Sequence, residues 1–305
     1  MPRRTDREHK LEEATPLIIE AALNGGTPKD RNPHVPRTVD EIVESALACL
    51  EAGAAIVHNH NDEPNVGGSG RHASEPYAAA WGRILERYPD ALLYPTYAGG
   101  GPHTNVRERY AHIDELRAAG LLRISLLDPG TVNFDGIGPD GVPGTGDGVY
   151  QTTFGDVRWM ADYCREHRLA PSVSVFEPGF LRLALAYYER GELPEGATIK
   201  LYFGGRRLLF GLPPTRASLN AYLAMLDGTG LPWLVAVLGG DVTAGNLARL
   251  AVERGGHLRV GLEDYEGRRQ PRNEELVREA VALAEAAGRP VATPKDAARI
   301  LGLPG

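Results

Sequence analysis

The chain has 305 residues, of which 42% are hydrophobic and 24% are charged; this composition is ordinary for a folded globule and excludes global disorder. Its 33 basic and 40 acidic residues give a net charge of −7, so it lacks the basic excess of a nucleic-acid-binding protein. No apolar run approaches the ~20 residues that cross a bilayer, and the charged N-terminus does not look like a secretory signal. Cys49 and Cys164 are the only cysteines, so we expect a cytoplasmic enzyme without disulfides. From the charge and the lack of long apolar runs, we expect neither nucleic-acid nor membrane partners.

Short apolar runs alternate with amphipathic stretches along the chain. Strands are predicted at 17–23, 54–60, 91–97, 121–127, 171–176, 197–203, 233–238 and 257–263. Helices are predicted at 38–52, 75–88, 107–119, 154–167, 178–189, 214–226, 243–254, 274–287 and 294–301. Thr38 and Glu41 have the spacing of a capping box at the start of the first helix, and Gly53 is placed to end it.

Strict alternation of strands and helices implies parallel strands joined by right-handed crossovers. Eight such units predict a single-domain (β/α)8 TIM barrel over 16–305, preceded by an N-terminal extension at 1–15. The alternative is an open doubly wound sheet, but no GxGxxG or Walker motif follows a strand. The glycine- and proline-rich segments 24–37 and 135–148 are predicted to be long loops at the C-terminal ends of the strands.

The active site of such a barrel lies at the C-terminal ends of its strands. The second strand ends in His58-Asn59-His60, and the period of two along a strand directs both imidazoles to the same side. The eighth strand ends at Glu263, and closure of the barrel brings it near the second strand. Two imidazoles and one carboxylate are a ligand set for a catalytic divalent metal with an open coordination position.

Several segments carry a resemblance to a known family, including PLIIEAALNGG at 16–26, EAGAAIVHNH at 51–60, PGTVNF at 129–134 and GGHLRVGLED at 255–264. Over nearly its whole length the chain resembles the β-keto acid cleavage enzymes, typified by 3-keto-5-aminohexanoate cleavage enzyme. The resemblance implies a barrel with one divalent cation, usually zinc, held by His58, His60 and Glu263. It further implies that a β-keto acid and acetyl-CoA give acetoacetate and a new CoA thioester. A homo-oligomer, with a tetramer suspected, is also expected from the resemblance.

The same resemblance assigns roles to further residues. Asp264 matches the acid/base carboxylate of the family. Tyr97, Gly99 and Gly100 match the segment that holds the substrate carboxylate, and glycines let backbone N–H groups approach an anion closely. Ser125 is the nearest match to a hydroxyl that contacts substrate. These residues are therefore candidate catalytic and substrate-binding groups.

The chain departs from the family where an arginine is expected after the seventh strand, because 239–241 reads Gly-Gly-Asp. We hypothesise that a neighbouring loop supplies the cation, from Arg206, Arg207 or Arg268. Asn24, at the end of the first strand, is a candidate substrate contact, although it could also cap a turn. Glu20 within that strand is expected to pair with Arg123 or Arg259, because burying a lone carboxylate is costly.

Two other enzyme classes remain open. Lys200 lies in the sixth predicted strand, where Schiff-base aldolases carry their amine, although it could also be a structural lysine paired with a helix carboxylate. A metal-dependent hydrolase of a small carboxylate-bearing substrate is the third reading, because amidohydrolases also carry an HxH pair. They place it on the first strand and need later histidines, which the ends of predicted strands five to seven lack.

Overall fold

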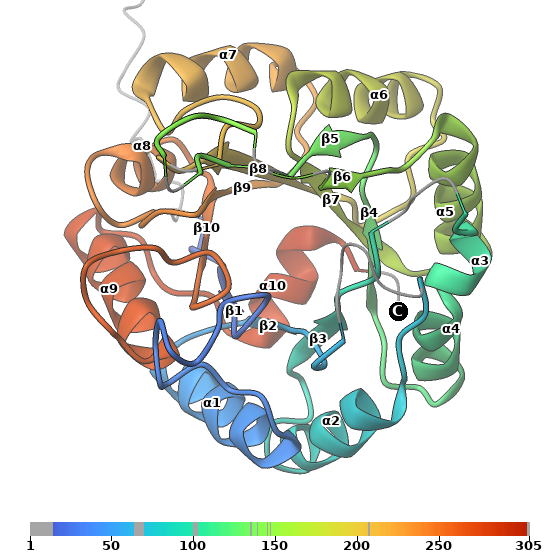
Figure 1. Cartoon of the computed structure of the whole chain (residues 1–305), viewed down its shortest axis with the longest axis horizontal. Coiled ribbons are helices and arrows are strands. Elements are labelled where there is room, and N and C mark those ends of the chain that lie inside the picture. The colour runs from blue at the N-terminus through green and yellow to red at the C-terminus, as the bar shows by residue number, and fades with distance from the viewer. Residues whose placement is uncertain are drawn as a thin grey trace, which may run out of the picture.

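Parallel strands form a nearly closed barrel in the computed structural model, which describes residues 15–63, 70–99, 103–134, 136–138, 140–144, 146, 148–206 and 208–303. Eight strands are hydrogen-bonded in the order β3-β2-β1-β10-β9-β8-β7-β4, and β3 also contacts β4, which brings the two edges of the sheet together. Figure 1 shows these strands at the centre of a ring of helices. The predicted single-domain (β/α)8 barrel is confirmed.

The barrel strands are β1 (Ile19–Ala22), β2 (Ile56–Asn59), β3 (Leu92–Pro95), β4 (Ile124–Leu127), β7 (Ala170–Val175), β8 (Thr198–Gly204), β9 (Trp233–Leu238) and β10 (His257–Val260). The outer helices are α1 (Val39–Ala52), α2 (Glu75–Arg87), α3 (Val106–Arg109), α4 (Ala111–Ala118), α5 (Phe154–Glu166), α6 (Pro178–Glu189), α7 (Arg216–Leu226), α8 (Leu247–Glu253) and α9 (Asn273–Ala286). All eight predicted strands are present, mostly shortened at their ends.

The pairing of β1 with both β2 and β10 positions the site. Ala22 is in register with His58 on one side, and Glu20 with Arg259 on the other. The strand that ends in the histidine pair and the strand that leads to Glu263 therefore flank the same central strand. This arrangement brings residues from the two halves of the chain to one end of the barrel.

Two local features differ from the sequence-based expectation. The segment predicted as a long loop at 135–148 is flanked by a short antiparallel hairpin of β5 (Val132–Asn133) and β6 (Val149–Tyr150), which brings Tyr150 over the barrel mouth. The helix predicted at 107–119 is divided into α3 and α4 around Tyr110, whose side chain packs into the core.

The first helix, α1, begins and ends at the residues that the sequence predicts. The capping box of Thr38 and Glu41 starts α1, and Gly53 ends it with a φ of 116°, which only glycine adopts readily. The last helix, α10 (Pro294–Leu301), lies across the end of the barrel opposite the C-terminal ends of the strands, where Leu301 adjoins Ile56 and Ile124. Of the predicted extension at 1–15, only Thr15 is among the described residues. In the part of the chain that the structure describes, no helix has the length and apolar character needed to cross a membrane.

Candidate metal centre and active site

A cavity of about 300 Å³ opens at the C-terminal ends of the strands. Its walls combine the histidine pair with polar groups and aromatic rings from almost every strand: Gly26, His58, His60, Thr96, Tyr97, Leu126, Asp128, Phe134, Tyr150, Ser174, Phe176, Lys200, Tyr202, Leu238 and Glu263. Apolar and aromatic walls with a few converging polar groups are typical of a small-molecule site.

His58, His60 and Glu263 converge on one point of this cavity. Each offers one ligand atom, and these atoms all lie within 4.8 Å of one another. The Nε2 atom of His58 is 3.2 Å from Oε2 of Glu263, and Nε2 of His60 is 3.3 Å from Oε1. Three side chains from β2 and the end of β10 thus meet as the sequence predicts.

The donor set fits a cation at this point. Nδ1 of His58 lies 3.2 Å from the carbonyl oxygen of Tyr94, which can only accept, so this nitrogen carries the proton. Burial lowers the pKa of His58 to about 4, so the ring is neutral and its Nε2 presents a lone pair. That lone pair faces the Glu263 carboxylate, whose Oε2 is buried without a hydrogen-bond partner. Two electron-rich atoms in contact call for a positive ion between them.

Neighbouring residues hold the three ligands in place. Asn24 donates to the carbonyl oxygens of Pro36 and His60, and its Oδ1 accepts from the N–H groups of Gly25 and His60. Gly25 has a φ of 49°, and a Cβ there would lie 2.3 Å from Cγ of Glu263. The glycine therefore leaves the space that the glutamate side chain occupies.

Arg259 connects the candidate metal ligands to a buried charge network. Its guanidinium contacts Glu20 at 2.8 Å, Glu263 at 2.7 Å and Asp264 at 2.8 Å. Burial would raise the pKa of Glu263, but the Arg259 guanidinium holds it well below the ordinary range. Burial raises the pKa of Asp264, because it outweighs the opposing effect of Arg259.

Lys200 joins the same network from β8. Its Nζ donates to the Tyr94 hydroxyl at 2.9 Å and lies 3.7 Å from Oε1 of Glu20. Burial lowers the pKa of Lys200. Burial also opposes ionisation of Glu20, but Lys200 and Arg259 lower its pKa to about 2. The lysine therefore points into the barrel and pairs with a strand carboxylate, not with the helix carboxylate considered from the sequence.

A strand residue lies beside Asp264, whereas the two described loop arginines considered from the sequence do not. Arg206 and Arg268 are exposed, and Arg207 lies outside the described residues. Arg259 supplies the positive charge from β10, the strand that leads to Glu263. Its pairing with Glu20 confirms one of the two partners expected for that carboxylate.

The other candidate residues occupy different positions relative to the cavity. Tyr97 lines it, and its hydroxyl lies 3.2 Å from Oγ1 of Thr152. Gly99 is buried but is not among the lining residues, and Gly100 lies outside the described residues. Asp264 is buried against Arg259 beside the cavity and is likewise not part of its lining.

Two proposed substrate contacts face elsewhere. The Ser125 hydroxyl lies 3.2 Å from that of Tyr110, on the outer side of β4, whereas Leu126 lines the cavity. Successive residues of a strand point to opposite faces, so a shift of one residue in the match to the family moves the predicted hydroxyl from the cavity side of β4 to its outer side. Asn24 uses its amide to fix the backbone around His60, so it positions the histidine and leaves no free group for substrate.

The sequence reasoning does not single out Asp128, which directly follows β4 and lines the cavity. Burial raises the pKa of this carboxyl. A usable signal exists in the sequence, because Asp128 lies two positions after the inward-facing Leu126 and therefore on the same face.

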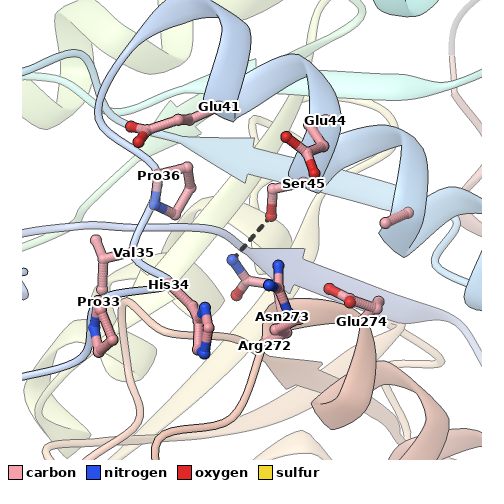
Figure 2. A pocket seen from close by; sticks show the side chains of 11 residues that line it. Pro33, His34, Val35, Pro36, Glu41, Glu44, Ser45, Arg272, Asn273 and Glu274 are labelled. Atoms are coloured by element: carbon pink, nitrogen blue, oxygen red, sulfur yellow. Dashed lines mark hydrogen bonds between the residues drawn. The ribbon is translucent and has the colours of Figure 1, made fainter.

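A second cavity, of about 290 Å³, lies outside the barrel between the loop after β1, the helix α1 and the start of α9 (Figure 2). Figure 2 shows Glu41, Glu44 and Glu274 around it, with Asn273 hydrogen-bonded to Ser45. Glu41 already accepts from the backbone N–H groups of Arg37 and Thr38 as part of a helix cap. These contacts are structural, and the histidine pair lies in the other cavity.

Comparison with known proteins identifies the family. A family model described as beta-keto acid cleavage enzyme matches residues 16–303. This chain belongs to that family. It is 30% identical to a 3-keto-5-aminohexanoate cleavage enzyme of Fusobacterium nucleatum over 295 residues, covering 94% of this chain and 98% of the relative. It is 32% identical to a 3-oxoadipate:acetyl-CoA acetyltransferase of Cupriavidus necator over 308 residues, covering 95% of each.

A solved structure agrees on the fold of this β-keto acid cleavage enzyme family member. The apo structure of ObcA superposes with a TM-score of 0.68 at 19% identity, and the match covers 89% of this chain and 66% of that one. Family membership makes the chain an enzyme that cleaves β-keto acids.

Proposed function

We propose that this enzyme exchanges acyl groups between a β-keto acid and acetyl-CoA at a divalent-metal centre. The balanced reaction is R–CO–CH2–COO⁻ + CH3–CO–SCoA → R–CO–SCoA + CH3–CO–CH2–COO⁻. The bond between the keto carbon and the CH2 group breaks, and the acetyl carbon forms the new bond to that CH2 group. Relatives named as 3-keto-5-aminohexanoate cleavage enzyme and 3-oxoadipate:acetyl-CoA acetyltransferase support this reaction class.

The observation that carries the metal centre is the contact of two imidazole nitrogens with one largely buried carboxylate, at 3.2 and 3.3 Å. We propose zinc, because two nitrogens and one oxygen with an open position are typical of catalytic zinc. A divalent ion held by His58, His60 and Glu263 would act as a Lewis acid on the keto oxygen.

We assign the proton transfer to Asp264. The CH2 carbon can bond to the acetyl group only after it loses a proton, so the reaction needs a base. Asp264 adjoins a metal ligand, and burial raises its pKa toward the range in which a carboxylate is an effective base. Arg259 holds the carboxylate in place through its Nε and Nη2 atoms, at 2.8 and 3.2 Å. Tyr97, in the cavity wall, stays a proposed contact of the substrate.

The experiment combines metal analysis with an assay for acetoacetate. The purified protein should contain about one divalent ion per chain, and a panel of β-keto acids with acetyl-CoA should release acetoacetate. Treatment with EDTA should abolish release, and zinc should restore it. Retention of full activity in the metal-free protein would contradict the proposal.

A Schiff-base mechanism on Lys200 is the alternative to the metal-dependent one, because this lysine lines the same cavity and burial lowers its pKa. Borohydride added with a β-keto acid would trap a Schiff base as a stable adduct on this lysine. We expect no adduct, and mass spectrometry of the peptide that contains Lys200 would detect one. An adduct together with EDTA-insensitive turnover would favour the aldolase reading.

We also propose that the enzyme is cytoplasmic and forms a homo-oligomer, as the family resemblance suggests, with a tetramer as the specific expectation. Light scattering coupled to size-exclusion chromatography measures the mass in solution directly. A mass near 32.9 kDa, that of a single chain, would contradict the oligomer.

A further inference from the structure

One oxygen atom of a buried carboxylate in the cavity has no hydrogen-bond partner. Asp128 is only 5% exposed. The Tyr150 hydroxyl donates to its Oδ2, whereas Oδ1 is buried with no partner in hydrogen-bonding geometry, although the Ser174 hydroxyl is close enough to lower the pKa. An ionised carboxylate buried in this way is costly unless a positive group pairs with it.

The cations nearest to Asp128 are committed elsewhere. Lys200 attracts it at a distance but bonds to Tyr94 and lies beside Glu20. Arg109 also attracts it, but its guanidinium donates to backbone carbonyl oxygens and lies over the Tyr97 ring. Among the described residues, no basic side chain forms an ion pair with Asp128.

Aromatic rings surround the same part of the cavity. Tyr150, which bonds to Asp128, has its ring centroid 5.5 Å from that of Phe134 and 6.0 Å from that of Phe176. Phe176 stacks on Tyr202 with centroids 4.6 Å apart. All four rings line the cavity. Aromatic rings whose faces are available beside a carboxylate form the kind of site that binds ammonium and quaternary ammonium groups.

We propose that Asp128 and these rings bind a positively charged group on the acyl side chain of the substrate. The β-keto acid would then carry an ammonium or quaternary ammonium group, placed against Asp128 while its keto group lies toward His58, His60 and Glu263. This inference rests on the proposed acyl exchange. A second carboxylate on the side chain would meet Asp128 as a like charge, so substrates such as 3-oxoadipate are disfavoured.

The test compares substrates of nearly equal shape and different charge. The probes are 3-keto-5-aminohexanoate, its neutral isostere in which methyl replaces the ammonium group, and 3-oxoadipate, each assayed with acetyl-CoA. A hydrogen bond to a charged group predicts that kcat/KM for the amine exceeds that for the isostere by roughly 10- to 100-fold. The order expected for the wild type is amine, then isostere, then diacid.

The variant Asp128→Asn keeps the shape and removes the charge, so it should bring the ratio of amine to isostere close to one, chiefly through KM. Glu44→Gln is the control: it removes an exposed carboxylate that does not line this cavity and should keep the wild-type ratio. An Asp128→Asn protein that retains the ratio would overturn the proposal. If this variant fails to fold, the wild-type ratio still decides.

Failure here is distinguishable from failure of the proposed reaction. Equal turnover of amine and isostere by the wild type, with acetoacetate released from both, overturns the charged subsite and leaves the acyl exchange standing. If no substrate releases acetoacetate, calorimetric binding of the amine and the isostere to the metal-loaded protein answers the question separately. Tighter binding of the amine supports the subsite, and equal binding overturns it.

Discussion

The two sides of the cavity differ in how their charges are balanced. The metal side comprises His58, His60 and Glu263 in the cavity wall, with Asp264 and Arg259 beside them outside the lining; the aromatic side comprises Asp128, Phe134, Tyr150, Phe176 and Tyr202. On the metal side, both carboxylates contact a guanidinium directly. On the aromatic side, the carboxylate accepts a hydrogen bond from the Tyr150 phenol and forms no ion pair with a described basic residue. In the proposed reaction, the balanced metal side acts on the keto acid group that all β-keto acids share, whereas the aromatic side contacts the side chain in which they differ.

The largest effect should come from removing the base on the metal side. Asp264→Asn should lower kcat by about 10²- to 10⁴-fold, the usual contribution of a positioned general base, and leave the metal content unchanged. Wild-type kcat should rise with pH as Asp264 loses its proton, at a pH above the ordinary aspartate range because burial raises this pKa. The variant should lack that rise.

The pH profile of kcat and metal analysis check this prediction. Asp241→Asn is a suitable control, because this carboxylate caps its own loop by accepting from the backbone N–H and hydroxyl groups of Thr243. An Asp264→Asn protein with kcat within a few-fold of the wild type would show that the metal side performs no proton transfer through this carboxylate.

The next effect concerns stability and comes from the charges beneath the metal side. The pKa of Glu20 falls from 4.5 to about 2 in the folded protein, so its ionisation stabilises the fold above pH 4.5, and this contribution is lost as the pH falls toward 2. Such a shift corresponds to about 3 kcal/mol. Glu20→Gln should therefore lower the free energy of unfolding by about that amount at pH 7 and by little near pH 2.

Denaturant unfolding of the metal-loaded proteins over this pH range measures the difference. The exposed Glu44 supplies the control, because Glu44→Gln removes a carboxylate that faces solvent. Stability curves of Glu20→Gln and the wild type that stay parallel from pH 7 to pH 2 would mean that Lys200 and Arg259 do not hold Glu20 ionised.

A smaller effect should follow from crowding one metal ligand. In Gly25→Ala, the new Cβ would lie 2.3 Å from Cγ of Glu263, so the glutamate must move. We expect metal affinity to fall by roughly 10- to 100-fold, as for other changes that misplace a ligand. Gly26→Ala is the neighbouring control, because nothing lies within 4 Å of a Cβ built there. Competition with a chromophoric chelator measures both affinities, and equal values would contradict the prediction.

The sequence predicts the metal side well for physical reasons. The period of two places His58 and His60 on one face, and closure of the barrel makes β10 a neighbour of β1, so the approach of Glu263 follows from topology. The role of Arg259 does not follow, because one strand residue contacts three carboxylates that lie in different parts of the sequence.

The aromatic side is harder to predict because it is assembled from many segments. Tyr150 reaches Asp128 through a two-residue hairpin strand that lacks the length to give a pattern in the sequence. The acid itself precedes Pro129, in a context that also suits an ordinary turn. Its burial and missing partner are properties of the packed cavity, and strand periodicity shows only which way it points.

The smallest effect on activity should come from changing Ser125, which lies on the outer face of β4, away from the cavity. Its hydroxyl contacts Tyr110 behind the aromatic side, whereas the next residue, Leu126, lines the cavity. Ser125→Ala should therefore change kcat/KM by less than about two-fold and cost about 1 kcal/mol of stability for one lost hydrogen bond. Leu126→Ala, which alters the cavity wall itself, should change KM measurably. Steady-state kinetics of the two variants checks the register, because a large loss of kcat/KM in Ser125→Ala alone would place the serine on the substrate side of β4.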